Sequence, residues 1–344
     1  MCPNRTKTAP LITIGSNIPI PLFGLDFLGI LDRGTNVLEV KPITICNLYC
    51  KYCFVSAGDY QRNFVADSDY LLRWIQKAVD FKQDDSIEIH LAPYGEIFLY
   101  PEIEQLIKGI KTLQKVKTIS LQTNGLLLNH DLIQKLERWG VDRLNISLNS
   151  MDPNSCANYC GVKSYNLPRL LQTFEEVLQS NMELLIAPVW FKGVNDKGIQ
   201  DIVEYLLRKH QQGYTWPKLR LGIQNYLTYK TGRKIHRAKM REFSYFYQIL
   251  QGWEKKTGLK LKLGPDDFGI HKTNAIMPNV LREQKAKVKI LLQGRWKNEY
   301  VAQFGENWAV KVLSRINLQP NQEIKIKFIK SLLHGNLLTA IPSE

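Results

Sequence analysis

From residue 36 onward, the chain alternates short runs rich in β-branched residues with longer stretches in which apolar residues recur at three- and four-residue spacing. The first pattern is typical of strands and the second of amphipathic helices, and their alternation indicates parallel βα units. The pattern predicts six strands, at Val37–Ile43, Ser86–Leu91, Lys117–Gln122, Arg143–Leu148, Glu183–Trp190 and Lys218–Gln224. Six such units predict an α/β fold, an open (β/α)6 partial TIM barrel.

The two ends of the chain depart from this pattern. Residues 1–36 are rich in Pro, Gly and Ile, and we expect an irregular N-terminal extension there. At residue 285 the helical patterns stop and short alternating runs take over, which predicts a small antiparallel β-barrel of about five strands. The predicted domains are therefore a βα domain over 37–284 and a small β-barrel over 285–344.

Composition narrows the class of protein and the kind of partner. The 344 residues are 44% apolar, which is enough for a large core, and no run approaches the ~20 apolar residues of a membrane span. The first ten residues lack the apolar segment of an export signal, so we expect a soluble, cytoplasmic protein with no membrane contact. The net charge of +14 permits a polyanionic partner. A basic surface without a dedicated ligand explains that charge equally well.

Candidate chemistry centres on the cysteines. Three of the six form a C-x3-C-x2-C motif directly after the first predicted strand, at Cys46, Cys50 and Cys53. Crowded thiols in a reducing compartment indicate metal binding or redox chemistry rather than disulfides, and thiolates favour iron–sulfur clusters or zinc. Zinc would need a fourth close ligand, whereas three cysteines leave one iron of a [4Fe–4S] cluster open. A buried or zinc-bound trio is the structural alternative.

This cysteine loop resembles the signature of the radical S-adenosylmethionine (SAM) superfamily, with the aromatic Tyr52 just before the third cysteine. Tyr94-Gly95-Glu96 resembles the glycine-rich motif that holds the SAM amino group, although Tyr94 stands where the family usually has glycine. Other stretches follow in the family's order: Thr123-Asn124-Gly125, as in the molybdenum-cofactor-biosynthesis branch, then Ser147 and Asn149, and then Phe191–Asn195. The resemblance spans about residues 37–225.

The resemblance implies a cofactor set and a reaction. Cys46, Cys50 and Cys53 would bind three irons of a [4Fe–4S] cluster and SAM would bind the fourth, so that one electron releases a 5′-deoxyadenosyl radical that abstracts hydrogen from a substrate. An electron donor such as ferredoxin or flavodoxin is then a partner. The SAM contacts implied by the motifs are Tyr52, Gly95, Glu96, Thr123, Asn124, Ser147 and Asn149. No catalytic residue is assigned, and methylation, thiolation and rearrangement all stay open.

A second pair of cysteines has no such signature. Cys156 and Cys160 are four residues apart and would share one face of a helix. A second cluster, a sulfur donor or a redox thiol pair are the functional interpretations, with Cys2 as a further ligand. Small apolar core residues are the favoured interpretation.

Two basic regions suggest that the substrate is RNA. Between Lys230 and Arg241 there are six basic residues and no acidic one, and residues 286–344 carry nine Lys and Arg against four Asp and Glu. The C-terminal runs resemble the TRAM/OB-like RNA-binding barrel of some radical SAM tRNA-modifying enzymes. Candidate substrate-binding residues are Lys230, Arg233, Lys234, Arg237, Lys297 and Trp308.

The leading functional hypothesis is therefore modification of RNA, above all tRNA. A radical SAM enzyme that acts on a protein, a peptide or a small-molecule cofactor precursor is the alternative. The non-enzymatic alternative is a binding protein with a structural cluster.

Overall fold

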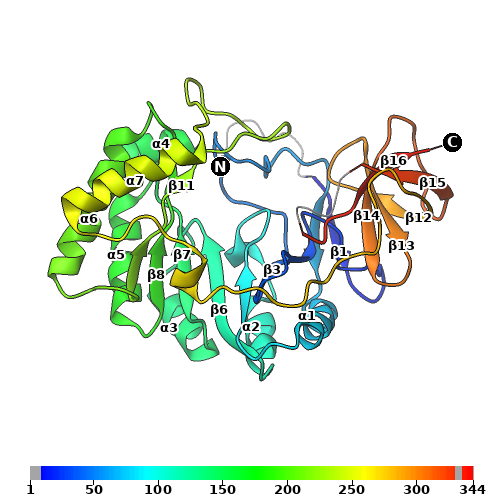
Figure 1. Ribbon diagram of the computed structural model, residues 1–344, viewed down its shortest axis with the longest axis horizontal. Coiled ribbons are helices and arrows are strands. Elements are labelled where there is room, and N and C mark those ends of the chain that lie inside the picture. Colours follow the sequence, from blue (N-terminus) through cyan, green and yellow to red (C-terminus); the bar gives the residue numbers. More distant parts are fainter. Residues whose placement is uncertain (1–8, 330–334, 344) are drawn as a thin grey trace. The chain divides into compact units, whose positions relative to one another are not determined.

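The computed structural model describes residues 9–329 and 335–343 of the 344. Within these residues the chain forms two compact units. The first unit comprises residues 46–58 and 120–269, and the second comprises residues 9–45, 59–119, 270–329 and 335–343. Each unit is thus assembled from segments that are far apart in the sequence (Figure 1).

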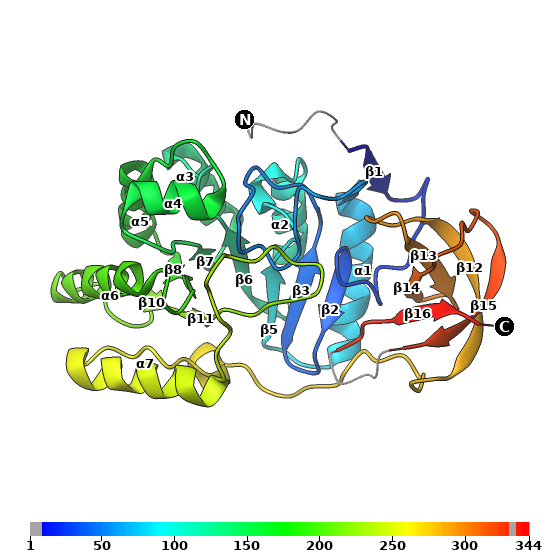
Figure 2. The same ribbon diagram turned by 90° about the horizontal axis from the view of Figure 1, so that it is seen from above.

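The first unit is an α/β layer of parallel strands and helices. Its strands β6, β7, β8 and β10 pair in that order and in parallel, and the short strands β9 and β11 pair with each other. Helix α5 packs on β8 and α6 packs on β10 (Figure 2). The elements are β6 (Val116–Thr123), through which the boundary between the units passes, α3 (His130–Trp139), β7 (Arg143–Ile146), α4 (Pro153–Cys160), α5 (Leu167–Gln179), β8 (Glu183–Ile186), β9 (Val189–Trp190), α6 (Asp196–Gln211), β10 (Leu219–Leu221), β11 (Gln224–Asn225), α7 (Phe243–Thr257) and the 3-10 helix η2 (Pro265–Phe268).

Local sequence signals set the ends of these helices. Asn129, Asp152 and Asn166 precede α3, α4 and α5, and each side chain accepts the backbone N–H three residues later. Gly140 and Gly161 end α3 and α4 in the left-handed conformation, with φ of 90° and 67°. The short α4 therefore ends at a defined point, which matters for the site below.

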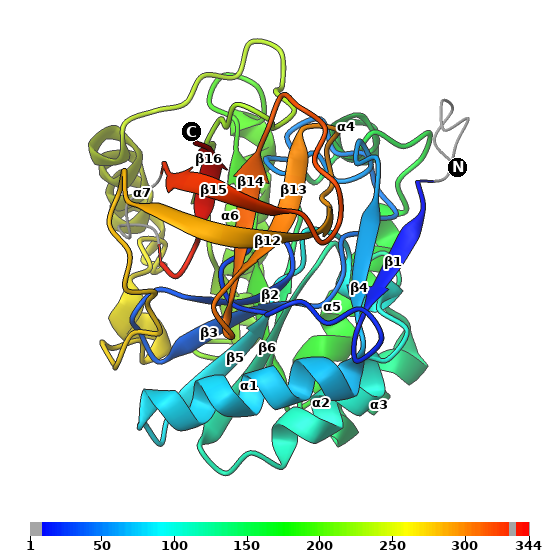
Figure 3. The same cartoon turned by 90° about the vertical axis from the view of Figure 1, so that its right-hand side faces the viewer.

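The second unit holds the remaining strands of the α/β layer and a separate β-barrel. Strand β3 pairs in parallel with β5 and antiparallel with β2, while β1 pairs with β4. Helices α1 and α2 lie side by side (Figure 3). The α/β elements are β1 (Leu11–Ile14), β2 (Gly29–Asp32), β3 (Val37–Lys41), β4 (Asn63–Ala66), α1 (Ser68–Lys82), β5 (Ile87–Leu91), the 3-10 helix η1 (Ile97–Leu99) and α2 (Ile103–Lys111).

The C-terminal strands close into a barrel in the order β12-β13-β14-β16-β15. Its interior is a compact apolar cluster that includes Val288, Ile290, Val310, Ile326 and Phe328. The strands are β12 (Lys285–Gln293), β13 (Glu299–Phe304), β14 (Trp308–Leu313), β15 (Glu323–Phe328) and β16 (Thr339–Pro342). All neighbours pair antiparallel except β14 and β16, which are parallel.

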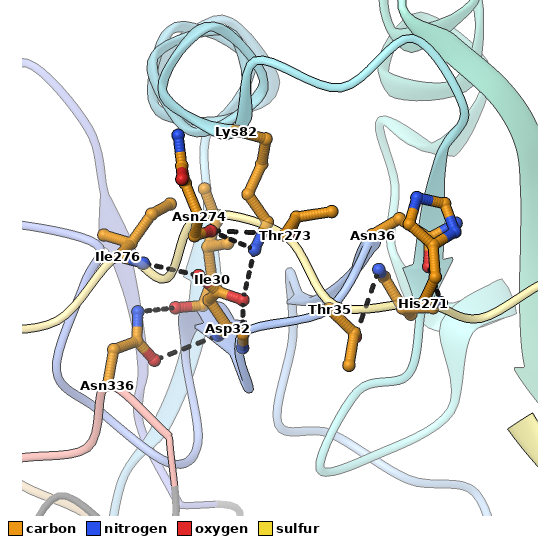
Figure 4. Close-up of polar contacts among 12 residues, drawn as sticks. Ile30, Asp32, Thr35, Asn36, Lys82, His271, Thr273, Asn274, Ile276 and Asn336 are labelled. Carbon is orange, nitrogen blue, oxygen red and sulfur yellow. Dashed lines mark hydrogen bonds and ion pairs between the residues drawn. The ribbon is translucent and has the colours of Figure 1, made fainter.

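A buried ion pair ties distant parts of the second unit together (Figure 4). The Nζ of Lys82, at the end of α1, lies 2.7 Å from an Asp32 carboxylate oxygen at the end of β2, and both side chains are 0% exposed. Lys82 also donates to the carbonyl of Asn274, and Asp32 accepts the backbone N–H of Ile276 at 2.6 Å. The side chain of Asn336 accepts the Asp32 backbone N–H at 3.0 Å. One helix, one strand and two later segments therefore depend on this pair.

The fold agrees with the class predicted from the pattern. Each of the six predicted strands overlaps an observed strand, namely β3, β5, β6, β7, β8 and β10, and the C-terminal region is a closed five-stranded barrel. The stretch 1–36, predicted to be irregular, contains β1 and β2 within its described part. All four residues of β2 are buried, so this strand lacks the alternation that marks a half-buried strand. No helix in the described part of the chain is long and apolar enough to cross a membrane.

Candidate functional site

The three cysteines of the C-x3-C-x2-C motif lie on one loop of the first unit. All three lie outside any disulfide and are partly exposed, and the backbone N–H of Cys53 donates to the carbonyl of Cys50 at 3.2 Å, which makes a tight turn. Among residues 9–329 and 335–343, no three His, Cys, Asp or Glu side chains are grouped closely enough to hold a single metal ion. The three thiols of this loop are therefore not arranged to bind one and the same metal ion.

This donor set fits a cluster of several irons. In an iron–sulfur cluster each cysteine binds its own iron, so the thiols need not converge on one atom. The pKa of the Cys50 thiol is raised by a hydrogen bond with Cys160 and by burial, and burial also raises the pKa of Cys53. These thiols are therefore protonated until a metal displaces the proton.

Helix α4 is tied to the cysteine loop on both sides of Cys50. The backbone N–H of Tyr49 donates to the Cys160 carbonyl at 3.1 Å, and that of Lys51 donates to the Tyr159 carbonyl at 2.8 Å. Gly161 permits this approach, since a Cβ there would lie 2.2 Å from the Tyr49 carbonyl oxygen. The end of α4 therefore fixes the backbone position of Cys50.

The second cysteine pair has two separate environments, both buried. The Cys156 thiol donates to the Ser150 carbonyl at 3.1 Å, as expected of a satisfied core residue. Cys160 is the largest cause of the raised pKa of the Cys50 thiol, so the two side chains are neighbours. Cys2, the further ligand considered, lies outside the described residues. The functional interpretations of this pair stay predictions.

Arg233, from the basic stretch 230–241, reaches back to the same loop. Its Nε donates to the Cys50 carbonyl at 2.8 Å, one terminal nitrogen donates to the Ala57 carbonyl at 2.9 Å, and its guanidinium stacks on the Tyr49 ring at 3.9 Å. Ser56 bonds the Thr231 carbonyl at 2.7 Å. The basic stretch is thus attached to the cysteine loop, and Arg233 is engaged in that attachment.

Tyr52, the aromatic of the motif, is held by residues from two other motifs. Its hydroxyl oxygen accepts a hydrogen bond from the Asn149 side-chain amide at 2.7 Å, and its ring packs on Phe191 at 4.9 Å. The Asn149 side-chain oxygen accepts the Val189 N–H at 2.7 Å. Burial raises the pKa of Tyr52, so this tyrosine is neutral. The structure therefore brings the first, fourth and fifth motifs together.

The third motif lies at the end of β6. The side-chain amide of Asn124 donates to Asn47 of the cysteine loop at 2.8 Å. The Thr123 hydroxyl accepts the Gly125 N–H at 3.0 Å, and Ser147 accepts from the Gln122 side chain at 3.2 Å. Polar groups from successive strands thus end at one edge of the parallel sheet, where ligands bind in such folds.

Gly95 and Glu96 belong to the second unit. The Glu96 N–H donates to the Ile45 carbonyl at 2.7 Å, and its carboxylate, 1% exposed, accepts the Phe98 N–H at 3.2 Å. A Cβ on Gly95 would lie 2.2 Å from the same Ile45 oxygen. The Gly-Glu motif is therefore bonded to Ile45, the last residue of this unit before the cysteine motif in the sequence.

Tyr94, which stands in place of the family's glycine, has a defined environment. Its ring lies 5.0 Å from the Lys41 ammonium and 5.7 Å from the Arg295 guanidinium. Arg295, at the turn between β12 and β13, also contacts Glu299 at 3.0 Å and Asp26 at 3.3 Å and is 4% exposed. A residue of the C-terminal barrel therefore supports the loop that carries Gly95 and Glu96.

The predicted substrate-binding residues fall into two groups. Lys230, Lys234, Arg237 and Lys297 are exposed. Trp308 is half-buried, packs on Phe23 at 5.8 Å and adjoins the barrel core, so its ring is used in packing. The attachment roles of Arg233, Gly161 and Arg295 were not predicted, because each contact joins residues more than 100 positions apart.

Comparison with known proteins identifies the family. The model of the radical SAM superfamily matches residues 40–206. "Uncharacterized protein MJ0103" of Methanocaldococcus jannaschii is 32% identical over an alignment of 359 positions, which covers 99% of this chain and 82% of that protein. The chain belongs to the radical SAM superfamily. It is therefore a radical SAM enzyme, and the cofactors of this family are a [4Fe–4S] cluster and SAM, as the motifs predicted.

Other relatives cover parts of the chain. GTP 3′,8-cyclase of Clostridium botulinum is 26% identical over 174 residues, so the chain spans about half the length of that enzyme (52%) and matches it over 50% of its own. SuiB of Streptococcus suis, bound to SAM, has a TM-score of 0.52 at 18% identity over 67% of this chain and 51% of that one. Native anSMEcpe with bound AdoMet has a TM-score of 0.52 at 14% identity over 80% and 76%. These structures show the shared radical SAM fold.

Proposed function

We propose that Cys46, Cys50 and Cys53 bind the [4Fe–4S] cluster. The cluster would supply one electron to SAM, whose cleavage would give methionine and a 5′-deoxyadenosyl radical. The protein's own part is positional: α4 and Arg233 hold the loop, and Tyr52 is fixed by Asn149. The proposed SAM contacts are Tyr52, Gly95, Glu96, Thr123, Asn124, Ser147 and Asn149, with the buried Glu96 carboxylate suited to the SAM ammonium group. We place the enzyme in the cytoplasm, with a ferredoxin or flavodoxin as electron donor.

The cluster assignment is tested by 5′-deoxyadenosine release. Anaerobically reconstituted protein should contain about four irons and four sulfides and release 5′-deoxyadenosine when given dithionite and SAM. Cys50→Ala should abolish release because it removes one iron ligand. The control is Cys156→Ala, which removes a buried thiol bonded to the Ser150 carbonyl and should keep release. Equal loss in both variants would contradict the assignment.

A glycine substitution tests the Gly-Glu motif. Gly95→Ala places a Cβ against the Ile45 carbonyl and displaces the loop that carries Glu96, so we expect turnover of SAM to fall about a hundredfold. Gly252→Ala on α7 is the matched control, because its Cβ meets nothing within 4 Å. The measurement is 5′-deoxyadenosine released per cluster, with cluster content determined separately. If the Gly95→Ala enzyme is as active as the control, this loop is not part of the SAM site.

We further propose that the substrate is RNA, above all tRNA. The observation that carries this proposal is the basic stretch 230–241, which is attached to the cysteine loop through Arg233 and Ser56. Its other basic residues include Lys230, Lys234 and Arg237, which are exposed. A cluster of cations attached to the loop that starts the radical chemistry is suited to a substrate that carries phosphates.

A protein, peptide or small-molecule substrate is the second candidate. It is favoured by the likeness to the GTP 3′,8-cyclases, which covers half of the chain. That likeness covers 50% of the chain, so half of this chain has no counterpart in it. The second candidate gives no role to that half.

Charge reversal in the basic stretch separates the two substrates. The double variant Lys230→Glu, Lys234→Glu should weaken tRNA binding at least tenfold at about 0.1 M salt, because each lysine lost removes a phosphate contact and each glutamate repels one. Lys135→Glu with Lys255→Glu, on α3 and α7, makes the same change of charge elsewhere on the first unit. Fluorescence anisotropy with labelled tRNA measures the affinity. Unchanged affinity in the first variant, together with unchanged tRNA nucleosides after turnover, would favour the second candidate.

A further inference from the structure

The outer face of the C-terminal barrel carries a regular array of lysines. Strands β12 and β15 pair antiparallel, and their register places Lys285 opposite Lys327 and Lys287 opposite Lys325. Lys289 follows on β12, opposite Glu323. We call the five residues Lys285, Lys287, Lys289, Lys325 and Lys327 the lysine ladder. Figure 3 shows β12 and β15 side by side on the face of the barrel turned to the viewer.

The alternation along both strands points the ladder outward. Val288 and Ile290 of β12 and Ile326 of β15 lie in the barrel core, so the residues between them face away from it. Lys285, Lys287, Lys289 and Lys325 are exposed and Lys327 is half-exposed. The ladder is therefore a positively charged surface on two neighbouring strands.

Pairing like charges directly across two strands is unfavourable for folding, because it places them only about 5 Å apart at the Cβ atoms. Protection of an exposed sheet edge often accounts for lysines on outer strands. That reason does not apply here, because the barrel is closed and both strands are paired on each side. The ladder therefore calls for another explanation, and an anionic ligand supplies one.

In the described part of the chain, two acidic residues lie beside the ladder, one near each end. Glu283 lies 2.8 Å from the Lys327 ammonium, and Glu323 is in register with Lys289. The central pair, Lys287 and Lys325, has lysines on one side along both strands and Lys289 with Glu323 on the other. The positive charge is thus concentrated at the middle of the face.

We propose that the lysine ladder binds the phosphate backbone of a single-stranded segment of RNA. This inference rests on the proposed RNA substrate and names the surface that holds it. Lysines two apart on a strand are about 6.8 Å from each other, a spacing comparable to that of successive phosphates in an extended strand. The aromatic rings of Phe304 and Trp308 pack against the barrel core and are not part of the ladder. The ladder consists of lysines alone, so it recognises the charge of the backbone, and binding is independent of base sequence.

The test uses the full-length holoenzyme and labelled poly(U). The triple variant Lys287→Gln, Lys289→Gln, Lys325→Gln should reduce the slope of log affinity against log salt by about 2, at ~0.7 per phosphate contact, and weaken binding about a hundredfold at ~0.1 M salt. The control variant Lys108→Gln, Lys111→Gln, Lys117→Gln removes two charges from α2 and one from β6, and it should bind RNA like the wild type. The thermal midpoint of the triple variant should not fall, because the repulsion between Lys287 and Lys325 is relieved.

The outcomes separate this inference from the proposed function. If the wild type binds poly(U) and tRNA and the triple variant binds them equally well, the ladder is not the surface, while the RNA substrate stands. If the wild type binds neither RNA, both are overturned. Tighter, ladder-dependent binding to phosphatidylserine vesicles than to RNA would overturn RNA as the occupant. Release of 5′-deoxyadenosine from SAM alone should be unchanged in the triple variant, which shows that the radical SAM site is intact.

Discussion

Replacing Lys82 by Met is expected to lower the free energy of unfolding by about 3–5 kcal/mol. The substitution keeps the volume of the side chain but leaves the Asp32 carboxylate, 0% exposed, without its cation. It also removes the hydrogen bond to the Asn274 carbonyl. Because Asp32 further accepts the Ile276 N–H and its backbone is bonded by Asn336, the effect should spread to both segments (Figure 4).

Urea unfolding measures this effect against a matched control. Lys111 ends α2 as Lys82 ends α1, but Lys111 is exposed, so Lys111→Met should change stability by less than about 1 kcal/mol. Adding Asp32→Asn to Lys82→Met removes the uncompensated charge and should recover part of the loss. Equal stability of Lys82→Met and Lys111→Met would contradict the role of the pair.

The second large effect is expected at Arg295. Arg295→Met leaves Glu299, 2% exposed, as a buried and uncompensated carboxylate, and we expect a loss of about 3–5 kcal/mol in unfolding free energy. The stack on Tyr94 is lost as well, so the loop with Gly95 and Glu96 loses its support. We therefore also expect SAM to bind about tenfold more weakly, which corresponds to ~1.4 kcal/mol.

Two variants separate the effect on stability from the effect on the loop. Arg295→Lys keeps the cation but not the planar fork, so its stability should lie between wild type and Arg295→Met. Arg315→Met removes an exposed arginine of the same barrel and should leave both quantities unchanged. The measurements are urea unfolding and equilibrium dialysis with SAM. Normal SAM affinity in a folded Arg295→Met enzyme would show that the barrel does not support the SAM loop.

Elements with regular periodicity could be predicted from the sequence. The strands of the α/β layer follow from runs of β-branched residues between amphipathic stretches, and the C-terminal barrel follows from alternation, as in Val288 and Ile290 facing in and Lys287 and Lys289 facing out. Strand β2 was missed because all four of its residues are buried and give no alternating signal. Its partner is β3, and nothing local to residues 29–32 indicates that pairing.

The candidate site also has a part that the sequence predicts and a part that only the structure shows. The spacing of Cys46, Cys50 and Cys53 predicts an iron–sulfur or zinc site, because a short loop brings its thiols close together, and the motifs that follow in the family's order favour the cluster. Arg233 was predicted to face the substrate, and the structure bonds it to the Cys50 carbonyl 183 positions away. A side chain's role depends on its partners, and the sequence does not show partners at that distance.

By itself, the sequence determined the fold class, the radical SAM family and the basic character of the chain, since these depend on residue types at short spacing. Only the tertiary structure decided that α4 holds Cys50, that Arg295 supports Tyr94 and that like-charged lysines face each other across β12 and β15. The physical reason is that ion pairs, stacking and strand register depend on distances in space. Those distances are set when segments that are far apart in the sequence pack together.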